Sequence, residues 1–121
     1  MAAVYNFTLD RGASLPPVQW MFPYDFTGSS FEVLIKQANG DLLTLSTEDG
    51  SLGMEVRTGI KVVRAGAQTE GDTTALTWAY TPEQSRLFTR AEYEMQHTDA
   101  VGGQAILLRG TITGIGGLNN D

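Results

Sequence analysis

Apolar and polar residues alternate along most of this 121-residue chain, and this period of two restricts its fold more than any other feature. In one such segment Phe31, Val33 and Ile35 occupy every second position. Successive side chains of a strand point to opposite faces, so such a segment places one face on a core and the other in water. The alternating segments are residues 5–9, 31–36, 43–46, 52–57, 76–80, 93–96 and 108–113. The pattern predicts an all-β protein.

Turn sequences separate these segments. Asn39-Gly40 and Asp49-Gly50 tolerate the positive φ angles of tight turns, so we expect a β-hairpin at each. Residues 64–74 are mostly small and polar, which indicates an exposed, mobile loop.

One short helix is expected over residues 81–88, between two of the strands. Thr81 is a suitable N-cap, Pro82 takes the first helical position, and Gln84 stands where a capping box needs it. Short strands about ten residues apart, with this single helical crossover, predict an immunoglobulin-like β-sandwich of about seven to eight antiparallel strands. The chain has no cysteine, so it lacks the disulfide of antibody domains.

The chain is long enough for one domain, which we expect over residues 1–114, with 115–121 as a flexible C-terminal tail. A formal net charge of −6 argues against nucleic acid as a partner. No apolar run is long enough to span a membrane, and Met1-Ala2-Ala3 leads directly into strand-like sequence without a signal-peptide pattern. The absence of cysteine favours folding in a reducing cytoplasm.

Residues with catalytic or metal-binding chemistry are few. His97 is the only histidine, and although Asp99 is close in sequence, no nucleophile completes a triad. Glu48-Asp49 is the densest acidic pair, but it lacks the spacing of a calcium loop. Gly114–Gly117 ends the chain instead of opening a helix, so it is no phosphate loop. We therefore expect no enzyme, no metal and no cofactor.

An aromatic cluster beside prolines is the best candidate for a partner-binding surface. Pro17 and Pro23 bracket a segment that we expect at a sheet edge, because proline cannot donate to a sheet ladder. The cluster holds more apolar side chains than one strand face can bury, and the proposed tail adds two apolar residues without a strand to hold them. The candidate partner-binding residues are Trp20, Met21, Phe22, Tyr24, Ile115 and Leu118.

A series of short motifs follows one another along the chain. The motifs are Tyr5-Asn-Phe-Thr-Leu-Asp-Arg-Gly12, Asp25-Phe26-Thr27-Gly28, the two glycine turns, Leu76-Thr-Trp-Ala-Tyr-Thr81 with Pro82-Glu-Gln-Ser85, Tyr93-Glu94-Met95, and Leu107-Leu108-Arg109-Gly110-Thr111-Ile112. In this order the motifs are similar to those of a family of small tailed-phage virion domains. Over nearly its whole length the chain thus resembles the baseplate upper protein N-terminal domain family. It departs at Glu94, where the family has Asp, and at Val101-Gly102-Gly103, which replaces an Asp-Gly turn.

The resemblance implies a non-enzymatic structural protein of the virion, made in the host cytoplasm. Its role would be a tail or baseplate or fibre-attachment component, present in symmetric copies, that docks other virion proteins. Two alternatives stay open. One is a capsid-associated protein, either head decoration or connector. The other is a carbohydrate-binding module, with a host glycan held by Gln19, Trp20, Tyr24 and Asp25.

Overall fold

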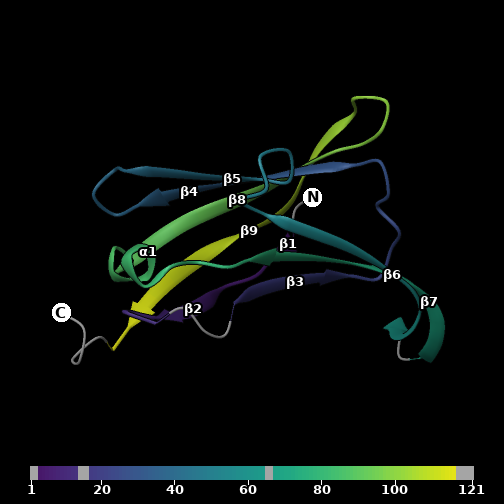
Figure 1. Ribbon diagram of the computed structural model, residues 1–121, viewed down its shortest axis with the longest axis horizontal. Coiled ribbons are helices and arrows are strands. Elements are labelled where there is room, and N and C mark those ends of the chain that lie inside the picture. The colour runs from purple at the N-terminus through teal and green to yellow at the C-terminus, as the bar shows by residue number, and fades with distance from the viewer. Residues whose placement is uncertain (1–2, 14–16, 65–66, 117–121) are drawn as a thin grey trace.

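The computed structural model describes residues 3–13, 17–64 and 67–116, which form two β-sheets packed as two layers (Figure 1). The expected all-β sandwich is confirmed, with one short helix. The elements, in order, are β1 (Ala3–Val4), β2 (Phe7–Asp10), β3 (Val18–Phe22), β4 (Ser30–Gln37), β5 (Leu42–Ser46), β6 (Gly53–Arg64), β7 (Ala67–Trp78), α1 (Pro82–Arg86), β8 (Arg90–Thr98) and β9 (Gln104–Ile115).

The strand order is that of an immunoglobulin-like sandwich. One sheet runs β1-β9-β8-β4-β5, with β2 also paired to β9, and the other runs β3-β7-β6. The strands β4, β8 and β9 thus take the positions of C, F and G, and β3, β7 and β6 those of B, E and D. The described part of the chain holds nine strand segments. Contrary to the expected antiparallel arrangement, β1 and β2 pair in parallel with β9.

A single core lies between the two sheets. In β4, Phe31, Val33 and Ile35 are buried while the residues between them are exposed, as the alternation predicts. Leu76 and Trp78 of β7 close the core from the other sheet. The core therefore combines inward-facing strand residues of both sheets with residues between the elements, such as Leu52, Tyr80 and Phe88.

The helix α1 forms the predicted crossover between β7 and β8. The Thr81 side chain accepts a hydrogen bond from the Gln84 backbone N–H, and the Gln84 side chain accepts one from the Thr81 N–H, which confirms the capping box. Ser85 is buried, and its hydroxyl accepts a hydrogen bond from the Gly12 N–H at 2.8 Å. This hydrogen bond connects the helix to the residues that directly follow β2.

Only one of the two predicted glycine turns is a hairpin. Asn39-Gly40 joins the paired strands β4 and β5, with Gly40 at a φ of 95°. Asp49-Gly50 leads from β5 to β6, which lie in different sheets, so the expected hairpin there is wrong. Turn chemistry specifies a local reversal of the chain and does not specify which sheet the next strand joins.

The mobile loop expected over residues 64–74 is also wrong. β6 and β7 pair as one long antiparallel hairpin, from Gly53 opposite Thr77 to Arg64 opposite Ala67, with an irregularity between Arg57 and Ile60. Small, polar residues are compatible with a two-stranded ladder because the backbone supplies its hydrogen bonds. At the C-terminus, β9 continues through Ile115, one residue beyond the expected domain boundary at 114.

Candidate functional site

The strand β3 lies at an edge of its sheet, as the prolines predict. In the described residues it pairs only with β7, from Val18 opposite Trp78 to Phe22 opposite Thr74. Trp20 points into the core, whereas Met21 points outward, in the alternation that the sequence indicates.

An open hollow of about 640 Å³ runs between this edge and the edge of the opposite sheet. We call it the edge groove. The N-terminal segment with β1, and the start of β9, form one wall, and β3 with the segment after it forms the other. Among the described residues the lining includes no charged side chain, and its polar side-chain groups are one amide, the Trp20 indole N–H and two tyrosine hydroxyls. The lining residues are Ala3, Val4, Tyr5, Gln19, Trp20, Met21, Phe22, Tyr24, Phe26, Leu107 and Leu108.

Aromatic side chains pack against one another at the base of the edge groove. Trp20 is 3% exposed, and its ring centroid lies 6.0 Å from that of Tyr93 and 5.8 Å from that of Phe7. The Tyr93 hydroxyl donates a 2.6 Å hydrogen bond to the Tyr5 carbonyl. Burial raises the pKa of Tyr93 above its ordinary value, partly opposed by the Trp20 indole. Tyr93 therefore stays protonated at neutral pH, and its hydroxyl links β8 to the N-terminal segment at Tyr5.

The structure brings four of the six candidate partner-binding residues together. Met21 and Tyr24 are 47% and 56% exposed and line the edge groove, which fits a contact role. Phe22 is half-buried and Trp20 belongs to the core, so these two side chains form the base of the groove and are less available for contact with a partner.

Of the other two candidates, Ile115 does not line the edge groove. Ile115 is half-exposed but pairs with Asp10 in the ladder of β2 and β9, so it is a strand residue and not part of a tail. Leu118, like the rest of the proposed tail beyond Gly116, lies outside the described residues.

Five lining residues escaped the sequence interpretation: Ala3, Val4, Tyr5, Leu107 and Leu108. They meet β3 only because β1 pairs with β9, with Ala3 opposite Leu108 and Val4 opposite Arg109. No local sequence pattern predicts a pairing between residues that are more than a hundred positions apart.

His97 has a structural environment. Its Nε2 lies 2.9 Å from the Ser29 hydroxyl, and its ring packs against Phe26 and Phe31 at centroid distances of 4.9 and 5.1 Å. Asp99 accepts hydrogen bonds from the backbone of Val101 and Gly103, as a turn residue does. The Asp99 carboxylate is thus held by its own turn, and the contact of His97 with a serine hydroxyl was not expected from the sequence.

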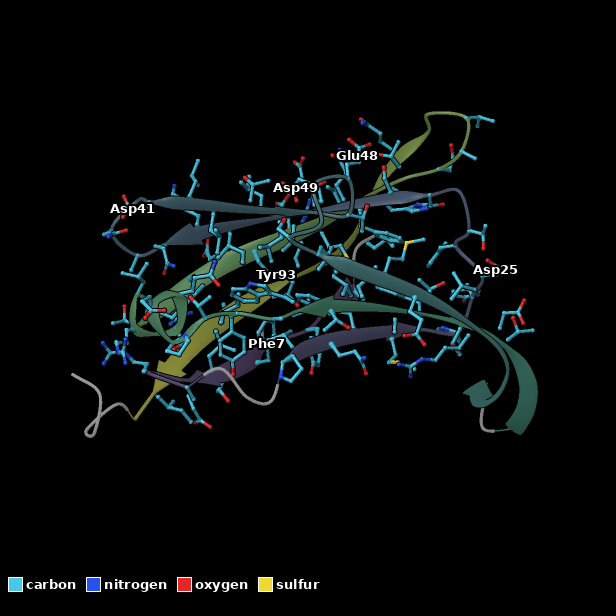
Figure 2. All side chains as sticks on the ribbon, in the orientation of Figure 1. Phe7, Asp25, Asp41, Glu48, Asp49 and Tyr93 are labelled. Atoms are coloured by element: carbon cyan, nitrogen blue, oxygen red, sulfur yellow. The ribbon has the colours of Figure 1, made fainter. Side chains whose placement is uncertain are left out.

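The acidic turns are also explained by local structure. Asp49 accepts hydrogen bonds from the hydroxyl and the backbone N–H of Ser51, and these hold its pKa below the ordinary value. Asp25 and Thr27 make the same arrangement, with the same effect on the pKa of Asp25. Both lie in outer loops (Figure 2). Across the described ranges, no three His, Cys, Asp or Glu residues gather as metal ligands.

Comparison with protein-family models, with curated proteins and with solved structures finds no match to this chain. Within residues 3–13, 17–64 and 67–116, no helix is long and apolar enough to cross a membrane.

Proposed function

We propose that this chain is a non-enzymatic structural protein of a tailed-phage virion, a tail or baseplate or fibre-attachment component that docks another virion protein through the edge groove. The ordered series of motifs supports the virion context. The sandwich supports the docking role, since it offers a rigid frame with an apolar surface along one edge.

The uncharged lining of the edge groove is the observation that carries the docking proposal. The outer face of the sheet β1-β9-β8-β4-β5 is strongly charged. Its exposed charged residues include Glu32 and Lys36 on β4, Glu92 and Glu94 on β8, and Arg109 on β9. The chain carries a formal net charge of −6, yet no charged residue is among those that line the edge groove. Interface centres are depleted in charged residues and enriched in aromatic residues and methionine, which is the composition found here.

A glycan is a poorer fit to this surface. Sugar binding uses exposed aromatic rings beside free polar groups, but Trp20 is buried in the core. The Asp25 carboxylate already accepts two hydrogen bonds from Thr27. A position on the head instead of the tail would use the same edge groove and is distinguished by where the protein is found in the particle.

The docking proposal predicts that a charge in the edge groove prevents incorporation into virions. We expect Met21→Glu and Tyr24→Glu to fold, because both side chains are about half-exposed, and to be missing from purified particles. Val101→Glu and Leu42→Glu are matched controls, since both residues are exposed and neither lines the groove. The measurement is immunoblotting of purified particles, with circular dichroism of each isolated variant. Normal incorporation of the two groove variants would contradict the proposal.

A further inference from the structure

The sheet formed by β3, β7 and β6 has one strand fewer than the four-stranded sheet of an immunoglobulin constant-type sandwich. In immunoglobulin-like domains this sheet has the order A-B-E-D, so strand A pairs with strand B. Here β3 takes the position of B, but the N-terminal strands β1 and β2 both pair with β9 in the opposite sheet. Over the part of the chain that the structure describes, the position beside β3 is vacant.

The edge groove occupies this vacant position. Its lining includes four consecutive residues of β3, Gln19 to Phe22, so it contains both inward and outward side chains. A hollow that touches both faces of a strand runs along the strand's edge, where the next backbone would lie. A second hollow of about 420 Å³ shares Tyr5 and Gln19 with the first and continues past Val18 to Pro17. The two together follow the length of β3, which fits an extended occupant.

We propose that an extended segment of another virion protein, a terminal arm or linker outside its own fold, adds to β3 as the missing fourth strand. Its side chains at alternate positions would be apolar and fill the edge groove, while its backbone would complete the ladder. This inference rests on the proposed docking function and names the form of the partner.

The β3 edge lacks the usual features that prevent strand addition. Edge strands of natural proteins commonly carry lysine, proline or a bulge that blocks further pairing. The five residues from Val18 to Phe22 include no charge and no proline, and their pairing with β7 is regular. Pro17 and Pro23 flank the strand and confine the open ladder to this length. The uncharged lining of the edge groove selects an apolar occupant there, whereas Asp10 lines the second hollow, so the occupant is not required to be uncharged near Pro17.

A second copy of this chain does not fill the same space. If two copies paired through their β3 edges, the inward side chains of the added strand would be Val18, Trp20 and Phe22, which already pack on their own core. Such a dimer would leave the edge groove empty. The hollow can be filled only by a strand whose inward side chains are not already packed in the core of the protein that supplies the strand.

The test uses the full chain and synthetic peptides of about nine residues, a length that covers a typical strand. The first peptide alternates threonine with valine or leucine and has lysine at both ends. The second has the same composition with its apolar residues in one block, and the third has proline at two alternate positions, which removes ladder donors. Binding is followed by NMR, through amide shifts and through the slowing of amide exchange in β3.

We expect the alternating peptide alone to bind and to protect amides between Val18 and Phe22. Met21→Glu and Tyr24→Glu should weaken this binding by at least about tenfold, and Val101→Glu by less than about twofold. No binding at millimolar peptide, or binding without protection of β3, would overturn the inference. So would sedimentation showing that the chain dimerises and that the groove variants are monomeric.

The same variants separate this inference from the proposed function. If Met21→Glu and Tyr24→Glu are missing from particles while no peptide protects β3, docking stands and strand addition is wrong. If the alternating peptide protects β3 while both variants enter particles normally, the groove accepts a strand and the proposed role in the virion is wrong.

Discussion

Gly110 determines how closely the N-terminal segment approaches β9. A Cβ atom at this position would overlap the carbonyl oxygen of Tyr5. That carbonyl accepts the hydrogen bond from Tyr93, and the Tyr5 N–H donates to the Arg109 carbonyl at 2.9 Å. The missing side chain of Gly110 thus lets the backbone between β1 and β2 pass directly over β9, and this crossing forms one wall of the edge groove.

Gly110→Ala should therefore destabilise the protein by about 1–3 kcal/mol, the usual range for inserting atoms into a packed site. Gly53→Ala is the matched control, because its Cβ would meet only ordinary van der Waals contacts in β6. We expect the control to change the free energy of unfolding by no more than about 1 kcal/mol. Urea denaturation of both variants provides the measurement. Equal stabilities would show that the crossing can shift away from β9.

At the scale of elements, the β6–β7 hairpin extends beyond the sheet that supports its base (Figure 1). Near Gly53 and Thr77 the hairpin is backed by the core and flanked by β3, whose ladder with β7 ends at Thr74. Past the irregularity between Arg57 and Ile60, the ladder continues from Ile60 opposite Gly71 to Arg64 opposite Ala67, and no third strand of the described part of the chain pairs with it there. A two-stranded ladder alone is marginally stable in water.

The backbone amides of residues 60–64 and 67–71 should consequently exchange with solvent faster than those of residues 53–57 and 73–77. Local opening of the outer ladder needs no disruption of the core, whereas opening of the inner ladder does. Hydrogen exchange followed by NMR at neutral pH compares the two halves within one sample. Equal protection of both halves would indicate that the outer ladder has support of its own.

For the whole molecule, the decisive feature is that two separate sheets share one core. Leu76 of β7 and Tyr93 of β8 belong to the same buried cluster, although their strands lie in different sheets. Neither sheet can keep its inward face from water alone, so we expect them to unfold together in a single transition.

Leu76→Ala should lower the free energy of unfolding by about 2–5 kcal/mol, the range for a fully buried leucine. Fluorescence of Trp20 and Trp78 reports on the sheet of β3 and β7, and amide signals of β8 report on the other. Both probes should shift to the same lower midpoint. By either probe, the exposed Leu42→Ala control should change the free energy of unfolding by no more than about 0.5 kcal/mol. Separate midpoints for the two probes would mean that the sheets are not coupled through the core.

Features that depend on residues close together in the chain could be predicted from the sequence. Alternation identified the inward side chains of β4, because a strand has only two faces. Thr81 and Gln84 specified the helix start, since both partners of the capping box lie within one turn. The prolines around β3 indicated an edge, and the opposite phases of Trp20 and Met21 followed from the same alternation.

The pairing of strands, in contrast, became known only from the tertiary structure. The parallel pairing of β1 and β2 with β9 leaves the position beside β3 vacant and brings Val4 and Leu108 to the edge groove. The turn at Asp49 passes between sheets, and the polar stretch after Arg64 continues a ladder. Strand alternation fixes the faces of a strand but not its partner. The partner depends on backbone hydrogen bonds and core packing between residues far apart in the chain, which no local pattern encodes.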